Sequence, residues 1–264
     1  MSIGFPTNTV LLIIAVMIGV GAGSWLILSQ GLSQIPVAPR LKRTWRWAGA
    51  IVLITWLLSR LALALHPPGG VVSRVSVTIT FLGLGMLAGV LPLLISPVFR
   101  QVVRAAPQTW LVGIQTIRVA GFLFLALMDM KLLPAEFALP AGYGDMTVGV
   151  LALAMIYLLA KRTPYARGLA IGWNLLGLLD LAVALTTGIL YTGPFAVQLA
   201  ASGVPLLYLN YVLIVPAFGV PLFALLHLYS LFQLVSVRAD ETTPGVGEPV
   251  HVPVFPTEQR SVHP

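Results

Sequence analysis

The chain alternates seven long apolar runs with short segments that are polar, basic, or rich in proline and glycine. A helix needs roughly 20 consecutive apolar residues to cross a bilayer, and each run is about that long or longer. The runs cover approximately residues 9–32, 47–66, 75–96, 107–130, 142–160, 168–190 and 206–237. This pattern predicts an all-α fold, a polytopic integral membrane helical bundle of about seven transmembrane helices over residues 1–238.

Three apolar segments depart from a simple membrane span. Residues 134–140 and 192–205 are too short to cross a bilayer, so we expect each to form a half-turn or small helix at the outer surface. The last run contains Pro216 and Pro221. Because proline interrupts helical hydrogen bonding, we expect a kinked or broken helix there, beside protein or a cavity that satisfies the freed backbone groups.

The distribution of basic residues predicts how the bundle is oriented. One alternate set of connections and flanks carries Arg40, Lys42, Arg43, Arg46, Arg100, Arg104, Lys161, Arg162, Arg167 and Arg238. The other set carries Arg74 and Lys131, with Arg60 near that side. Lys and Arg concentrate in cytoplasmic loops, so we expect the N-terminus outside and the C-terminus in the cytoplasm. Residues 239–264 lack hydrophobic periodicity and are predicted to form a disordered, Pro-rich cytoplasmic tail.

Composition supports the membrane assignment and narrows the chemistry. The chain is 58% hydrophobic and 9% charged, with mean hydropathy +0.96, whereas soluble domains are about 25% charged. We expect it in a membrane, specifically a bacterial inner (cytoplasmic) membrane. The net charge of +7 comes from loop clusters and accompanies no nucleic-acid-binding motif. The absence of cysteine excludes disulfides, thiolate metal sites and a cysteine nucleophile.

Several ionisable residues fall inside the apolar runs, where a charge needs a partner. At 100° per residue, Gln115, Arg118 and Asp129 lie along one stripe of the fourth run, and Asp180 lies on a stripe of the sixth. A rise of 1.5 Å per residue puts Arg118 and Asp180 at depths within about 5 Å of each other, so the two can pair. Asp145 is expected to begin the fifth span from the outside, level with Asp129.

We therefore expect a cluster of Arg60, Arg118, Asp129, Asp145 and Asp180 that opens toward the outside. It has two interpretations. Either it is a satisfied ion network that fixes helix register, or it lines a path or pocket for a proton, ion or polar solute. The run Gly-Tyr-Gly-Asp at residues 142–145 fits both, because its glycines permit a tight helix start with exposed N–H groups.

The full candidate polar site comprises Arg60, Gln115, Arg118, Asp129, Glu136, Tyr143, Asp145, Asn174, Asp180 and His227. His227 is the only histidine deep in a span and is expected near the inner boundary, either as a hydrogen-bonded packing residue or as a haem ligand or proton relay. His66 lies at the opposite interface, which disfavours a bis-histidine haem within the chain. Asn174 is expected to form interhelical hydrogen bonds. No catalytic residue and no metal ligand is assigned.

Enzymatic motifs are missing from the sequence. It has no G-x-S-x-G, H-E-x-x-H or P-loop run, so no carrier for an enzymatic reaction is identified. The cofactor is unknown, because a pigment, quinone or haem held by apolar contact alone leaves no sequence signal. Two functions from different classes remain. One is a small transporter or ion- or proton-conducting protein that uses the charged network, and the other is a structural or accessory subunit of a larger membrane complex.

The second function depends on faces where helices can approach closely. Small-residue pairs four positions apart allow such packing. They occur at Gly19/Gly23, Gly85/Gly89 and Gly168/Gly172. The expected partners are the lipid bilayer and either further copies of this chain or partner membrane subunits, but not nucleic acid.

Overall fold

The computed structural model describes residues 7–202 and 206–242, with side chains up to residue 236. Within these ranges every regular element is helical. In chain order the elements are α1 (Thr7–Gln34), α2 (Pro39–Leu65), α3 (Val71–Ile95), α4 (Pro97–Ala105), α5 (Gln108–Gly113), η1 (Ile114–Gly121), α6 (Phe122–Asp129), α7 (Ala135–Ala160), α8 (Ala166–Thr187), η2 (Gly188–Thr192), α9 (Gly193–Ala201), α10 (Leu207–Val212), η3 (Val215–Gly219) and α11 (Val220–Thr242). Element η1 is a 3₁₀-helix, and η2 and η3 are π-helices.

Seven helical segments are long and apolar enough to cross a membrane, which confirms the predicted all-α bundle. They are Thr7–Gln34, Pro39–Leu65, Val71–Ile95, Gln108–Asp129, Ala135–Ala160, Ala166–Ala201 and Leu207–Ser236. Helix α4 is an additional short helix between the third and fourth spans. The chain is therefore a multi-pass membrane protein.

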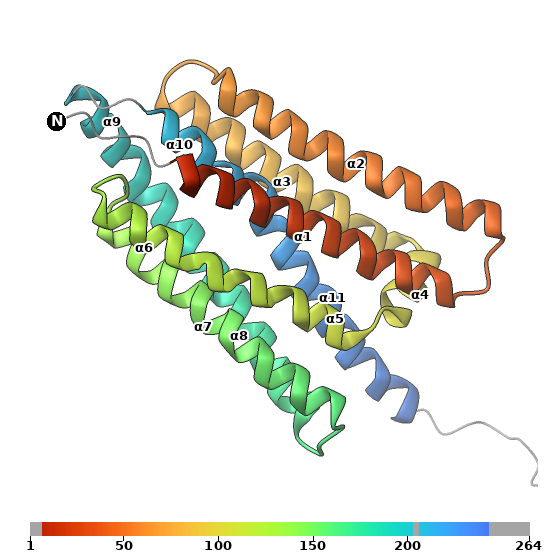
Figure 1. Ribbon diagram of the computed structural model, residues 1–264. Coiled ribbons are helices and arrows are strands. Elements are labelled where there is room, and N and C mark those ends of the chain that lie inside the picture. Colours follow the sequence, from red (N-terminus) through yellow and green to blue (C-terminus); the bar gives the residue numbers. More distant parts are fainter. Residues whose placement is uncertain (1–6, 203–205, 243–264) are drawn as a thin grey trace, which may run out of the picture.

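Helix α11 runs through the centre of the bundle. Figure 1 shows it between one group formed by α1, α2 and α3 and a second group formed by α5 to α8. Its side chains are buried on nearly every face, including Phe223, Leu226 and His227, whereas α2 buries only Arg60 and Ala64. An all-round apolar helix is stable at such a position because it contacts protein on all sides. Any polar group on α11 must accordingly find its partner inside the bundle.

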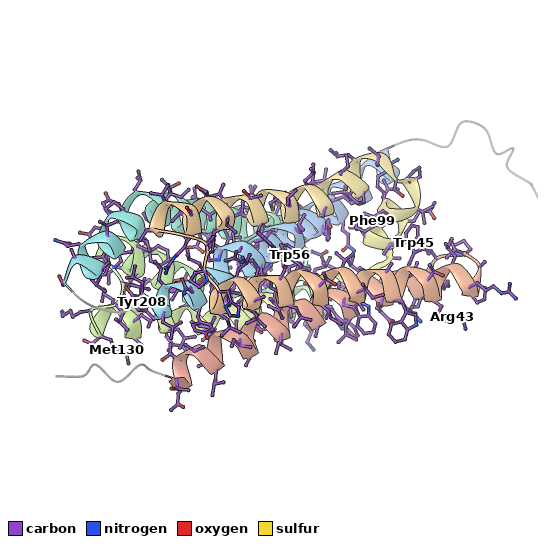
Figure 2. The ribbon with its side chains drawn as sticks, turned by 90° about the horizontal axis from the view of Figure 1, so that it is seen from above. Arg43, Trp45, Trp56, Phe99, Met130 and Tyr208 are labelled. Atoms are coloured by element: carbon purple, nitrogen blue, oxygen red, sulfur yellow. The ribbon has the colours of Figure 1, made fainter. Side chains whose placement is uncertain are left out.

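The bundle has two ends that can be told apart by their connections. We call the end with the α2–α3 and α6–α7 connections the outer end and the opposite one the inner end, following the expected orientation. Figure 2 shows Arg43, Trp45 and Phe99 toward one end and Met130 and Tyr208 toward the other. The first group marks the inner end and the second the outer end.

The prediction of a separate surface element at residues 134–140 is wrong. These residues form the first turns of α7, which begins at Ala135 and continues through Pro140. Phe137 packs edge-to-face on Phe124 of α6, with ring centroids 5.3 Å apart, and this contact holds the first turns in the bundle. The short helix predicted within residues 192–205 exists as α9, but it extends the sixth span through η2. Residues 203–205 lie outside the described residues.

The predicted break in the last span is confirmed. Helix α10 ends at Val212, the π-helix η3 contains Pro216, and α11 begins at Val220 with Pro221 in its first turn. Proline removes a backbone donor, so an uninterrupted α-helix would leave carbonyl groups unpaired here. At the other end, α11 continues to Thr242, four residues beyond the expected end of the bundle. The rest of the predicted tail lies outside the described residues.

Candidate functional site

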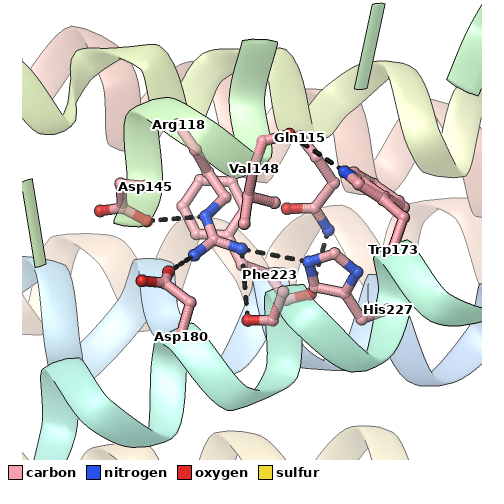
Figure 3. A network of polar contacts seen from close by, with 9 residues as sticks. Gln115, Arg118, Asp145, Val148, Trp173, Asp180, Phe223 and His227 are labelled. Carbon is pink, nitrogen blue, oxygen red and sulfur yellow. Dashed lines mark hydrogen bonds and ion pairs between the residues drawn. The ribbon is translucent and has the colours of Figure 1, made fainter. Parts of the chain in front are cut away.

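A charged network occupies the middle of the bundle, where η1, α7, α8 and α11 meet (Figure 3). Arg118 of η1 donates from Nε to Asp145 Oδ1 of α7 over 2.7 Å, and from Nη2 to Asp180 Oδ2 of α8. The Arg118 side chain is fully shielded from solvent, and those of Asp145 and Asp180 are 17% and 9% exposed. Charge-assisted hydrogen bonds of this kind are about twice as strong as neutral ones.

The third nitrogen of Arg118 reaches His227 on α11. Arg118 Nη1 lies 3.1 Å from His227 Nε2 and 3.5 Å from the carbonyl oxygen of Gly177. Because the guanidinium can only donate, His227 Nε2 must accept, and the imidazole proton lies on Nδ1. From Nδ1, His227 donates to Asn174 Oδ1 over 2.9 Å. The hydrogen-bond pattern therefore defines a neutral imidazole with one tautomer.

The hydrogen bonds continue from His227 toward the inner end. Asn174 Nδ2 donates to Ser230 Oγ over 2.8 Å and to the carbonyl oxygen of Ala170 over 2.7 Å. Ser230 Oγ also accepts from Gln108 Nε2 over 2.6 Å, and Gln108 is the first residue of α5. A continuous polar chain thus leads from the two carboxylates to the inner start of the fourth span. Its inner end is incompletely paired, because Gln108 Oε1 is buried without a hydrogen-bond partner.

The 3₁₀-helix η1 sets the direction in which Arg118 points. A 3₁₀-helix turns about 120° per residue and an α-helix about 100°, so the eight residues of η1 add about 160° of rotation. Within η1 the buried positions accordingly recur every third residue: Gln115, Arg118 and Gly121. Gln115 donates to the carbonyl oxygen of Phe223 over 3.1 Å, and the Phe223 ring lies 5.8 Å from the guanidinium carbon of Arg118.

Glycines let the four helices approach closely around this network. A Cβ at Gly144 would collide with Oδ1 of Asp180, and a Cβ at Gly177 would collide with the His227 ring. A Cβ at Gly121 would lie 2.6 Å from Cβ of Asp145. Real Cβ atoms do not approach other atoms so closely, so a larger residue at these positions would force the helices apart.

The network carries a surplus negative charge. Two carboxylates face one guanidinium, and His227 is neutral, which leaves a formal charge of about −1 when both aspartates are ionised. The pairs Arg118–Asp145 and Arg118–Asp180 are the ion pairs found among the described residues. A buried charge without compensation is costly, so the site favours binding one proton or one cation.

Two cavities reach Asp145. The larger is a partly open apolar pocket lined by Thr78, Phe124, Phe137, Leu181 and Thr192, among others, with Asp145 as its charged residue. The Thr192 hydroxyl there is buried without a hydrogen-bond partner. The smaller, of about 380 Å³, lies on the α1 side and touches both Arg118 and Asp145. The carboxylate of Asp145 is therefore the point of contact between the network and open space.

The structure brings six of the ten candidate residues into this network and leaves four outside. Inside are Gln115, Arg118, Asp145, Asn174, Asp180 and His227. Asp129, Glu136 and Tyr143 are exposed, and Arg60 contacts Thr78 and Phe81 instead. We expected a cluster of five residues: Arg60, Arg118, Asp129, Asp145 and Asp180. Only Arg118, Asp145 and Asp180 come together among them.

Two expected depths need correction. Asp145 does not begin its span but lies ten residues after Ala135, about 15 Å along α7, because residues 134–140 belong to that helix. Asp145 packs against Gly121. Asp129 lies about two helical turns further toward the outer end, and the extra rotation of η1 turns it away from the network. The glycines at 142 and 144 are therefore mid-helix contacts, not a helix start. His227 lies at the level of Arg118, not at the inner boundary.

Sequence reasoning missed Gln108 and Thr192. Gln108 is adjacent to a basic loop and shows no pattern that distinguishes it from a surface residue, and Thr192 follows the apolar run of the sixth span. No group of three or more His, Cys, Asp or Glu side chains arranged to hold a metal occurs in the part of the chain that the structure describes.

These features define a multi-pass membrane protein with a buried, hydrogen-bonded Arg/Asp network at its centre. The chain belongs to the family described as a domain of unknown function (DUF8737), whose model matches residues 75–235. That range includes every residue of the network and leaves α1 and α2 outside. Comparison with curated proteins and with solved structures gives no match.

Proposed function

We propose that the chain is a membrane carrier that exchanges a proton for a small, largely apolar solute with a cationic or hydrogen-bond-donating group. The observation that carries the proposal is the convergence of two carboxylates on one guanidinium at the edge of an apolar pocket. Intramembrane ionisable groups commonly mark substrate paths and proton relays. The bacterial inner membrane is the location that we propose for this exchange.

Charge balance supports an exchange of one proton for one cation. With one aspartate protonated, the network is neutral, which suits its mostly apolar surroundings. A cationic group beside Asp145 would compensate the same charge, so proton and solute compete for one site. The walls of the pocket are almost entirely apolar, which favours a solute that is itself mostly apolar.

Access to the site supports a carrier open on one side. The large pocket includes Val71 and Val75 from the outer start of α3 and Phe137 from the outer start of α7. On the inner side, the space next to His227 is filled by Asn174 and Ser230. A carrier needs one gate closed while the other is open, and the break at η3 offers a place where α11 can bend.

The test uses the full chain reconstituted in vesicles that contain a pH-sensitive dye. Tetraphenylphosphonium, a lipophilic cation, is added outside, and proton release is recorded against protein-free vesicles. We expect saturable proton release with the wild type. Asp145→Asn and Asp180→Asn should each lower the rate at least about tenfold, because either change removes the carboxylate surplus.

Asp129→Asn is the matched control, because Asp129 lies on an exposed surface at the end of the same span as Arg118. It should exchange at the wild-type rate. Equal rates in the wild type, Asp145→Asn and Asp180→Asn would contradict the proposal, since the network would then take no part in coupling.

A role as an accessory subunit is a second candidate, supported by an open face on α8. A Cβ at Gly168 or Gly172 would meet no atom within 4 Å, whereas the Gly85/Gly89 pair is covered by side chains of α2 and α11. Small residues exposed four positions apart allow another helix to pack closely. This face could therefore accept a partner helix or a second copy of the chain.

Purification in mild detergent followed by native mass measurement tests this candidate. A partner docked on α8 should be lost in Gly172→Leu and kept in Gly83→Leu, because Gly83 also faces open space but lies on α3. A particle that contains one copy of this chain and no other protein would contradict the accessory role.

A further inference from the structure

A second polar cluster lies at the outer end of the bundle, apart from the central network. It consists of Arg60 near the end of α2, Arg74 near the start of α3, and Asn210 on α10. These three side chains line a small cleft, partly open to the surroundings, together with Pro67 and Pro68 of the α2–α3 connection. The cleft is the place where two cationic groups converge.

Arg60 is buried with few hydrogen-bond partners. Only 3% of the residue is exposed, yet the one side-chain hydrogen bond that it makes with described residues is long, 3.5 Å from Nη2 to the Thr78 hydroxyl. Its Nε is buried with no partner, and its guanidinium carbon lies 5.0 Å from the Phe81 ring centroid. A guanidinium has five N–H donors, so most of the hydrogen-bonding capacity of Arg60 is unused.

Arg74 is held beside the cleft by neutral groups. Its Nη1 donates to Asn210 Oδ1 over 2.9 Å, and its Nε donates weakly to the Gly69 carbonyl over 3.4 Å. Asn210 is fixed in turn, because its Nδ2 donates to the Ala64 carbonyl over 3.1 Å. The amide of Asn210 therefore orients Arg74 without compensating its charge.

None of the residues that the structure describes supplies a carboxylate to this cluster. Residues 1–128 contain no Asp or Glu at all. Asp129 and Glu136, at the outer end, are exposed, and the ion pairs formed by the described residues all belong to Arg118. A buried guanidinium without an anion is costly, and two adjacent ones also repel each other.

We propose that this cleft binds a phosphate-type oxyanion, either the headgroup phosphate of a lipid in the outer leaflet or a free inorganic phosphate. Guanidinium groups match tetrahedral oxyanions with paired N–H donors and are the preferred side chains for phosphate. Arg60 lies five residues before the end of α2, about 7.5 Å from it, which puts the cleft close to the headgroup level. The proposal is independent of the exchange reaction at Asp145.

The experiment measures the thermal unfolding of the full chain in dodecyl maltoside, a detergent that contains no phosphate group. In one arm inorganic phosphate is titrated in, and in the other phosphatidylglycerol is added to the micelles. The anion should raise the midpoint by several degrees in a saturable manner, because a ligand that binds the folded state stabilises it. Arg60→Gln and Arg74→Gln should each require at least about ten times more anion for the same shift.

Arg100→Gln is the matched control, since Arg100 is half-buried like Arg74 but donates to the Leu93 and Leu94 carbonyls at the inner end. The unfolding midpoint of this variant should rise with the anion as it does in the wild type. If Arg60→Gln does not fold, Arg74→Gln still tests the site, because Arg74 is only partly buried.

The two arms distinguish the source of the anion. A variant-sensitive shift with phosphatidylglycerol alone assigns the site to lipid, and one with phosphate alone assigns it to a soluble anion. The absence of any shift in the wild type, or equal shifts in the wild type and both Arg variants, would overturn the proposal.

Discussion

Arg118 and Arg60 are buried almost equally, with 2% and 3% of each residue exposed, but their surroundings are opposite. Arg118 has two aspartates and a histidine around it, and each of its nitrogens has a partner. Arg60 has one hydroxyl at 3.5 Å and an unpaired Nε. Burial of a charge therefore does not by itself define a role, because the role depends on which partners the fold supplies.

The two regions also differ in the sign of the charge that they leave uncompensated. The central network has one carboxylate more than it has cations, whereas the described residues give the outer cleft two guanidinium groups and no carboxylate. The first favours a proton or a cation and the second favours an anion. The difference between the two regions can be tested by replacing each arginine in turn. Further variants replace the glycines and the asparagine that pack or hydrogen-bond around Arg118.

The largest effect is expected for Arg118→Ala. This change leaves Asp145 and Asp180 close together without a cation, and breaking a buried ion pair in this way costs about 3–5 kcal/mol. Thermal unfolding in detergent measures the loss. The triple variant Arg118→Ala, Asp145→Asn, Asp180→Asn should recover much of the stability, because no buried charge remains. A triple variant as unstable as the single one would contradict the pairing.

A smaller loss, about 2–3 kcal/mol, is expected for Gly144→Ala and for Gly177→Ala. The added methyl group would overlap the Asp180 carboxylate in the first case and the His227 ring in the second. Gly172→Ala is the control, because a Cβ there meets open space and alanine favours a helix. Unfolding midpoints of the three variants give the comparison. Equal midpoints would mean that α7 and α8 do not pack as closely as the glycines suggest.

Asn174→Leu should cost about 1–2 kcal/mol. Leucine has a similar volume but leaves His227 Nδ1 without an acceptor and Ser230 without one of its two donors. Arg118 still donates to His227 Nε2, so the proton should stay on Nδ1, but the nitrogen-15 NMR signal of Nδ1 in labelled imidazole should shift because its N–H has lost its acceptor. An unchanged Nδ1 signal in Asn174→Leu would show that Asn174 does not accept this hydrogen bond.

The smallest effect is expected for Arg60→Met in dodecyl maltoside without added phosphate or phospholipid. It removes one long hydrogen bond and one cation–π contact, and it also relieves a poorly compensated buried charge, so stability should change by less than about 1 kcal/mol. Arg118→Met, measured in parallel, should be several times more costly. Similar losses for the two variants would remove the contrast between the two arginines.

Hydropathy alone predicted the seven spans and the break in the last one. Apolar length and proline act locally, since a bilayer requires about 20 apolar residues and proline lacks a backbone donor wherever it occurs. The pairing of Arg118 with Asp180 was likewise within reach of the sequence, because their depths follow from a constant rise per residue. The depth of Asp145 was not, because it depended on whether residues 134–140 belong to α7, and these turns pack into the bundle through contacts such as that of Phe137 with Phe124.

The sequence by itself determined that this chain is a helical membrane protein with more buried charge than a bilayer tolerates unpaired. Only the tertiary structure decided which charges meet. The 3₁₀ turn of η1 rotated Asp129 out and Arg118 in, and Gly144 and Gly177 allowed Asp180 and His227 to reach it. Such rotations arise from packing between distant segments, so local residue patterns do not contain them. The same packing left Arg60 without a carboxylate, a fact that no single helix reveals.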